Sequence, residues 1–143
     1  MKQPFLACSI SLFVLGVALP AQQVPKTKGA DNAAVYFLSP KDGETVSSPF
    51  TVRFGLKGMG VAPAGVTTPN TGHHHLLVDM AAPPDFNAAL PVTENIRHFG
   101  AGQTETELKL PAGKHTLQLV LGDHLHIPHE KPIVSDKITI TVK

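Results

Sequence analysis

Apolar side chains alternate with polar ones along several short segments of this chain, and this alternation predicts β-strands. Residues 50–56, which read FTVRFGL, place a large apolar side chain at every second position. A period of two is typical of a strand with one buried face. Similar apolar runs predict further strands at residues 34–38, 45–46, 76–80, 104–110, 114–121, 133–134 and 137–142.

Helical spacing of apolar residues does not extend beyond two turns in any segment that we expect to fold. About seven short strands separated by turn residues favour an all-β fold, specifically an antiparallel immunoglobulin-like sandwich with long loops. A small closed barrel is the alternative. The longest expected loops are residues 58–72 and 81–103, and loops of this length often carry function.

The first residues have the features of an export signal rather than of a folded domain. Lys2 precedes an apolar run at residues 5–19, and small residues follow it. The run is shorter than the roughly 20 residues that a membrane helix needs, so we expect a cleaved signal peptide, with an uncleaved anchor as the alternative. The expected protein is periplasmic or secreted, with a signal peptide at residues 1–21, a flexible leader at 22–33 and a single β-sandwich domain at 34–143.

The charge balance and the cysteine content exclude several functions. The chain has 12 basic and 11 acidic residues, and removal of Lys2 with the signal peptide leaves 11 of each. No basic patch stands out, so nucleic acid and anionic membrane surfaces are poor candidates as partners. The single cysteine, Cys8, lies within the predicted signal peptide. The exported chain would therefore form no disulfide and supply no thiolate ligand.

Histidine is the residue type that points to chemistry, because eight histidines occur and most lie in two clusters. His73 and His75 are two apart, so their imidazoles project from one face of an extended chain, with Cα atoms roughly 6.5–7 Å apart. The same spacing pairs His124 with His126. Two such pairs could converge on one transition metal ion, whose bonds to imidazole nitrogen are about 2.0–2.1 Å long.

Two further histidines are candidate ligands. His98 lies in the second long loop and could complete the site, and a bend at Pro128 could return His129 toward the pair that precedes it. Asp79 and Asp123 are candidate partners for the ring N–H groups of bound imidazoles. Asp123 also fits ordinary turn chemistry, which we favour slightly.

Three other residues have structural interpretations. His115 lies on the apolar face of its strand directly after a turn, which predicts a buried ring that is hydrogen-bonded to the neighbouring loop. His74 points away from the face of His73 and His75. Met59 is flanked by glycines, and packing on the edge of the domain accounts for it better than a role as a thioether ligand of copper(I).

Imidazole ligands without cysteine suit copper(II), zinc and nickel. Calcium is disfavoured, because it binds about six to eight oxygen atoms and the chain has no acidic loop of that kind. We expect copper or zinc, with copper first because the compartment of an exported protein is oxidising. Binding would weaken below about pH 6, where protons compete for imidazole.

Five segments resemble one protein family. They are residues 36–43 (YFLSPKDG), 71–77 (TGHHHLL), 98–106 (HFGAGQTET), 113–119 (GKHTLQL) and 122–129 (GDHLHIPH). Together they are similar to the bacterial exported domain-of-unknown-function family numbered 4399, over roughly residues 34–143. The resemblance implies an exported, mostly β domain, and it supplies no reaction or ligand.

We therefore interpret the protein as an exported binder of copper or zinc that acts as a carrier, buffer or sensor. The main alternative is a structural or adhesive immunoglobulin-like module whose long loops bind a protein or envelope partner. A metal-dependent enzyme is a third interpretation. The sequence does not favour it, because it contains no serine elbow, no cysteine nucleophile and no His-Glu-x-x-His motif.

Overall fold

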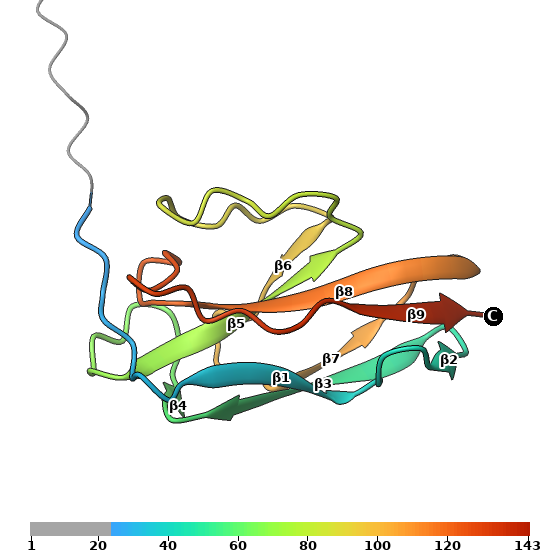
Figure 1. Ribbon diagram of the computed structural model, residues 1–143, viewed down its shortest axis with the longest axis horizontal. Coiled ribbons are helices and arrows are strands. Elements are labelled where there is room, and N and C mark those ends of the chain that lie inside the picture. Colours follow the sequence, from blue (N-terminus) through green and yellow to red (C-terminus); the bar gives the residue numbers. More distant parts are fainter. Residues whose placement is uncertain (1–23) are drawn as a thin grey trace, which may run out of the picture.

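The computed structural model describes residues 24–143, so the predicted signal peptide lies outside the described residues. Within this part, nine strands form two sheets (Figure 1). The smaller sheet has the order β1-β3-β7 and consists of β1 (Ala34–Ser39), β3 (Phe50–Lys57) and β7 (Glu105–Leu108). The larger sheet has the order β2-β9-β8-β5-β4, with β6 also paired to β5, and consists of β2 (Thr45–Val46), β9 (Ile138–Val142), β8 (Gly113–Gly122), β5 (Thr71–Val78), β4 (Gly60–Val61) and β6 (Ile96–His98).

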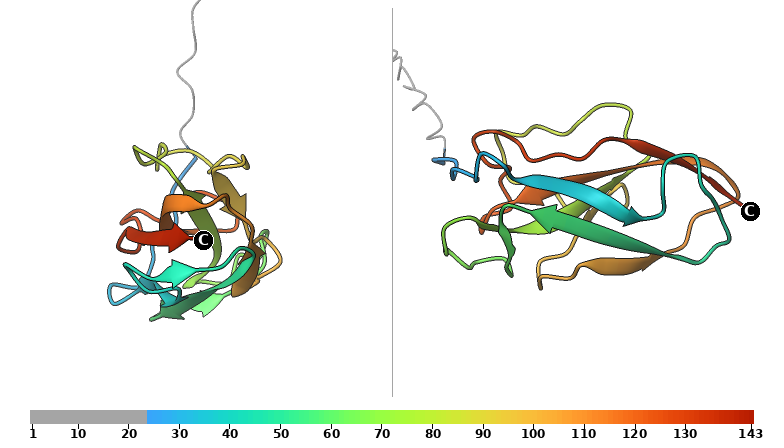
Figure 2. Two further views of the ribbon diagram at one scale, coloured as in Figure 1. Left: turned by 90° about the vertical axis from the view of Figure 1, so that its right-hand side faces the viewer. Right: turned by 60° about the horizontal axis from the view of Figure 1, so that its bottom comes forward.

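The two sheets pack face to face, and the main hydrophobic core lies between them (Figure 2). Each sheet contributes the apolar side chains that alternate along its strands, as the sequence pattern predicts. From the smaller sheet these include Val52 and Phe54, and from the larger sheet Leu76, Leu119 and Ile140. The all-β fold predicted from the sequence is therefore confirmed. The chain forms two separate sheets rather than one closed sheet.

Most strand pairs are antiparallel, as the sequence predicts, and two short strands make the larger sheet mixed. β2 pairs with β9 in parallel, and β4 pairs with β5 in parallel. Both are two residues long, and the loop that precedes β2 is already bound to β9 through Gly43 N–H and the Thr139 carbonyl, 2.7 Å apart. Parallel pairs at the margin of a sheet are not joined by a hairpin turn. Strands of two residues are also too short to show alternation, so the sequence pattern does not reveal these pairs.

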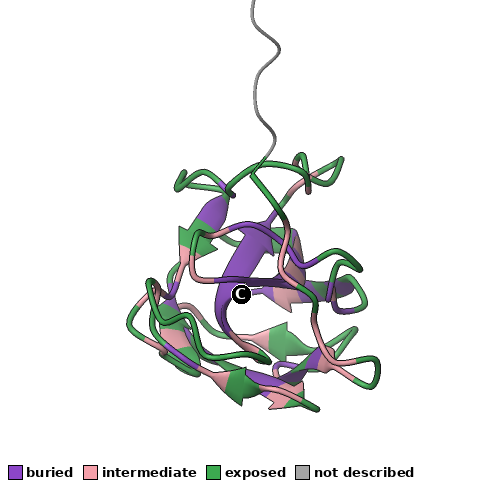
Figure 3. Cartoon of the chain, turned by 90° about the vertical axis from the view of Figure 1, so that its left-hand side faces the viewer, coloured by how far each residue is buried: buried purple, intermediate pink, exposed green. Residues whose placement is uncertain are grey.

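Strand β5 begins five residues earlier than the sequence pattern predicts. It starts at Thr71 rather than at residue 76, so the three consecutive histidines lie within the strand. β5 pairs with β8 along this length, with His73 opposite Gly122 and His75 opposite Val120. Residues 72–78 are all buried, and Figure 3 shows buried (purple) strand segments in the interior of the domain. The histidines are thus held by a rigid central strand rather than by a loop.

The second long loop covers the outer face of the larger sheet, which is the face away from the smaller sheet. The prediction that residues 81–103 are irregular throughout is wrong, because Ile96–His98 form β6 against β5. A second, smaller apolar cluster lies under this loop and consists of Leu77, Leu90, Ile96 and Val120, with Met80, Phe86 and Val134 packed against it. The outer face of β5 is therefore buried as well, and this position shapes the candidate site.

The part of the predicted leader that the structure describes is tied to the domain rather than free. The Glu130 N–H donates to the Thr27 carbonyl at 2.9 Å, and the Thr27 side chain is hydrogen-bonded to two residues of the loop that follows β8. The sequence around Thr27 contains no apolar anchor or motif that would have indicated this docking.

Candidate metal centre

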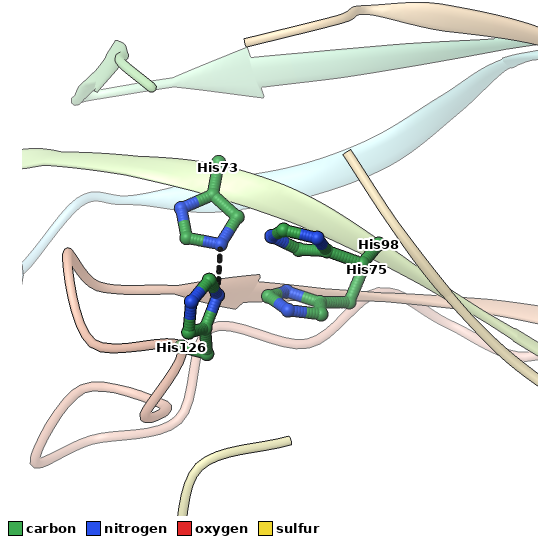
Figure 4. A group of neighbouring side chains, drawn as sticks. All are labelled: His73, His75, His98 and His126. Carbon is green, nitrogen blue, oxygen red and sulfur yellow. Dashed lines mark hydrogen bonds between the residues drawn. The ribbon is translucent and has the colours of Figure 1, made fainter. Parts of the chain in front are cut away.

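Four histidines from three separate segments meet on the outer face of the larger sheet. His73 and His75 come from β5, His98 from β6 and His126 from the loop after β8. One ring nitrogen from each can be chosen so that all four lie within 4.8 Å of one another. Figure 4 shows the four rings turned toward a common centre. His73 and His75 are fully buried, whereas His98 and His126 are partly exposed.

Strand geometry accounts for three of these positions. Alternation along β5 sends His73 and His75 to the outer face, and it sends His74 into the main core. β6 runs antiparallel to β5 with His98 directly opposite His75. Side chains that are directly opposite in a strand pair lie on the same face, roughly 4.5–5.5 Å apart at Cβ. The pairing of β6 with β5 therefore completes a group of three imidazoles.

A tight turn supplies the fourth imidazole. Asp123 Oδ1 accepts hydrogen bonds from the backbone N–H of Leu125 at 2.9 Å and of Ile127 at 3.0 Å. The N–H of His126 donates to the Asp123 carbonyl at 2.9 Å, and His126 itself has a φ of 66°. A non-glycine residue in this left-handed region is uncommon. The turn folds back along the end of β8 and directs the His126 ring at His73.

Glycine is required where the rings approach the backbone most closely. A Cβ at Gly122 would lie 2.6 Å from His75 Cε1, and a Cβ at Gly100 would lie 2.2 Å from His98 Cε1. Any larger residue at either position would displace an imidazole of the cluster. Both glycines lie next to histidine motifs in the sequence. The sequence does not show which imidazole ring packs against each glycine.

The distances in the cluster are close to those of a metal site. His73 Nε2 and His126 Nδ1 are 3.1 Å apart, and the ring centroids of the four histidines are 4.6–6.1 Å apart. Four nitrogens in a tetrahedron around an ion with bonds of about 2.0–2.1 Å would be about 3.3–3.4 Å from one another. Small rotations of the rings would bring the nitrogens to this spacing, so the four residues could hold a metal ion.

Several nitrogens of the cluster are buried without a hydrogen-bond partner in the part of the chain that the structure describes. They are both ring nitrogens of His75, Nδ1 of His73 and Nε2 of His98. A buried polar atom that lacks a partner costs about 1–3 kcal/mol, and native structures contain few of them. A bound cation would accept the lone pair of one nitrogen on each ring, and so remove the part of this cost that falls on those nitrogens.

The electrostatics of the cluster keep its buried rings neutral at neutral pH. Burial, followed by repulsion from His98 and His126, lowers the pKa of His73 to about 4. Burial, followed by repulsion from His73 and His98, lowers the pKa of His75 to about 3. Burial, followed by repulsion from His126, also lowers the pKa of His98. Neutral imidazole is the form that binds metal.

Two histidines that the sequence suggested as ligands lie outside the cluster. The expectation that alternation places His124 beside His126 is wrong, because β8 ends at Gly122 and a turn follows. His124 lines a separate surface groove with Thr67 and Asn70. His129 is buried, and its Nδ1 lies 2.8 Å from Thr27 Oγ1 rather than near the four rings.

The two candidate aspartates have other partners. Asp79 is not adjacent to the cluster; its carboxylate lies 2.7 Å from His115 Nδ1 and accepts from Thr116 N–H at 2.8 Å. His115 is buried, as predicted, and its Nε2 lies 2.9 Å from the Pro111 carbonyl. The hydrogen bond to Asp79 raises the pKa of His115. Asp123 performs the turn chemistry described above, which is the interpretation that the sequence favoured.

His74 and Met59 belong to the main core. His74 is fully buried, its ring centroid is 5.1 Å from that of Phe54, and neither of its ring nitrogens has a hydrogen-bond partner within residues 24–143. Burial lowers the pKa of His74, and backbone groups of Gln103 and Gly55 offset only part of this effect. Met59 packs against the same core. Neither residue is part of the candidate centre.

The fold and the site together define an all-β protein of two sheets with a histidine cluster that could hold a metal ion. Residues 52–143 match the family described as domain of unknown function (DUF4399), and the chain belongs to that family.

Comparison with other proteins adds one distant likeness. No curated protein matches the chain in sequence. The X-ray structure of the endo-beta-1,4-mannanase from Thermotoga petrophila is similar over 78% of this chain, with 23% sequence identity and a TM-score of 0.44. The chain spans only 20% of the length of that enzyme.

Proposed function

We propose that this protein is an exported binder of a transition metal ion, copper or zinc, and acts as a carrier, buffer or sensor. The ligands are His73, His75, His98 and His126. One observation carries the proposal: imidazoles from three distant segments converge until their nitrogens lie within 4.8 Å of one another, while most of their buried nitrogens have no other partner among the residues that the structure describes. The nitrogens of His74 also lack partners, but that ring packs against Phe54 in the main core; the convergence of four such rings is what points to a shared ion.

The donor set favours copper(II) or zinc. All four donors are imidazole nitrogens, which suit these ions better than calcium or magnesium, whose ligands are oxygen atoms. Met59 packs against the main core between the sheets, whereas the four histidines lie on the outer face of the larger sheet. The site therefore offers no thioether from this residue, and a preference for copper(I) has no support here.

The number of ligands favours binding over catalysis. Zinc sites with four protein ligands are typical of closed, structural sites, whereas catalytic zinc sites keep a position open for water or substrate. The four histidines here would fill a tetrahedral site. Export to the periplasm or outside the cell is supported by the signal peptide that the sequence predicts.

Titration of the purified protein with zinc and with copper(II) in a calorimeter tests the proposal. We expect one ion per chain with a sub-micromolar dissociation constant, and loss of this binding in the His73→Ala/His75→Ala double variant. His124→Ala is the matched control, because it removes a histidine that lies outside the cluster.

Absence of a sub-micromolar site in the wild-type protein would overturn the proposal, as would unchanged binding by the double variant. Partner binding that survives the double substitution would instead support a structural or adhesive module. Redox turnover by the copper-loaded protein faster than that of free copper would indicate an enzyme.

A further inference from the structure

The N-terminal segment contacts the same turn that carries His126. Thr27 Oγ1 lies 3.0 Å from Asp123 Oδ2 and 2.8 Å from His129 Nδ1. The Thr27 carbonyl accepts from the Glu130 N–H at 2.9 Å. Three hydrogen bonds therefore join one residue of this segment to the loop between β8 and β9, across about a hundred positions of the chain.

The direction of these hydrogen bonds follows from the number of protons. The Thr27 hydroxyl has one hydrogen, which it donates to the Asp123 carboxylate. Its oxygen therefore accepts from His129, which carries its proton on Nδ1. His129 and Asp123 are buried and Thr27 is half-buried, so this chain of donors and acceptors is partly shielded from water and is expected to be stronger than a fully exposed one.

Asp123 links Thr27 to the candidate ligand. Its Oδ2 is held by Thr27, while its Oδ1 accepts from the N–H groups on either side of His126. His126 has a φ of 66°, and a strained backbone of this kind persists only when its surroundings hold it in place. The Thr27 hydroxyl therefore fixes the orientation of the Asp123 carboxylate. The carboxylate holds the backbone turn that positions the His126 ring.

We propose that docking of residues 24–30 onto this turn controls the metal affinity of the site, with Thr27 as a positioning residue. This inference rests on the proposed metal binding. Groups that orient metal ligands from behind them commonly change affinity about 10–100-fold. Coupling between two sites is reciprocal. An ion bound by the four histidines must therefore tighten the docked segment, and release of the segment must weaken the hold on the ion.

Substitution of Thr27 tests the first half of the proposal. Thr27→Val keeps the shape of the side chain and removes the hydroxyl, and Thr27→Ser keeps the hydroxyl. Zinc affinity measured by competition with a chelator should fall about tenfold in Thr27→Val, the lower end of the range for such groups, and stay within about twofold of wild type in Thr27→Ser. Lys26→Ala is the control within the segment, because the one side-chain hydrogen bond of Lys26 in the described part of the chain is an exposed 3.5 Å contact with Asn87.

Hydrogen exchange in the wild-type protein tests the second half without any substitution. The Glu130 amide reports on docking directly, because it donates to the Thr27 carbonyl. We expect zinc to slow its exchange about tenfold, the reciprocal of the affinity change.

The two proposals fail in distinguishable ways. Wild-type protein that binds no zinc or copper would overturn the proposed function itself. Tight zinc binding that is equal in wild type and Thr27→Val, or exchange at Glu130 that zinc does not slow, would overturn the control by the N-terminal segment and leave metal binding intact. Weak binding by both Thr27→Val and Thr27→Ser would also overturn it, because the hydroxyl would then not be the cause.

Discussion

A methyl group at residue 122 is expected to remove one ligand without changing any histidine. Gly122→Ala would place its Cβ 2.6 Å from His75 Cε1 and 3.0 Å from His75 Nδ1. The backbone at Gly122 has no positive φ, so alanine fits the main chain there. The effect of the substitution therefore lies in the contact with the ring.

The size of the displacement follows from this contact. Carbon atoms in contact prefer a separation of about 3.5–4.0 Å, so the His75 ring must move by about 1 Å. Metal–ligand bonds tolerate deviations of only about 0.2 Å, and a ring displaced this far no longer coordinates. We expect zinc affinity to fall at least tenfold, which corresponds to about 1.4 kcal/mol of binding free energy.

Competition with a chelator measures this loss, and Gly60→Ala in β4 is the matched control. A Cβ at Gly60 would meet Thr71 Cγ2 at 3.5 Å, an ordinary contact, so its zinc affinity should equal that of wild type. The same affinity in Gly122→Ala, with the fold intact by circular dichroism, would refute the assignment of His75 as a ligand. The metal-free variant should also lose about 1–3 kcal/mol of unfolding free energy through overpacking.

Three further predictions concern individual histidines. The folded-state pKa values of His73 (about 4) and His75 (about 3) lie below the ordinary 6.5, so the unfolded chain takes up protons first as the pH falls. Each ring should remove up to about 1.4 kcal/mol of stability per pH unit between pH 6.5 and its folded-state pKa. Urea unfolding of the metal-free protein that shows no such decline would contradict this. His74→Leu should raise the unfolding free energy by about 1 kcal/mol, because it removes buried nitrogens that lack partners in the described residues. Zinc affinity should stay unchanged. A loss of stability would contradict the view that the His74 ring is poorly satisfied in the core. His126→Ala should weaken zinc binding at least tenfold in calorimetry, whereas His124→Ala should leave it unchanged. The reverse result would make His124, and not His126, the ligand.

Strand alternation in the sequence was sufficient for the all-β fold and for part of the cluster. It separated His73 and His75 from His74, because side chains on a strand alternate faces whatever their chemistry. It did not extend β5 back to Thr71, because consecutive buried histidines do not resemble a strand that is apolar on one face. The family over residues 52–143 is confirmed, while the signal peptide stays a prediction.

The remaining parts of the site depend on contacts between distant segments. The sequence proposed His98 only as an addition, and the pairing of β6 with β5 is what places it opposite His75. His126 and His124 could not be told apart by spacing, because the Asp123 turn replaces the strand that alternation assumed. Nothing local in the sequence pairs Thr27 with residues nearly a hundred positions later.

The arrangement of the four histidines also bears on how the chain resists unfolding. His73 and His126 are 53 positions apart, and His98 lies between them. The only cysteine, Cys8, lies in the predicted signal peptide, so an ion shared by these rings would act as the kind of cross-link that a disulfide provides in many secreted proteins. A permanent link across a loop of this length would restrict the unfolded chain by about 4 kcal/mol. Unlike a disulfide, this link could be opened by acid or by a competing chelator, without a reductant.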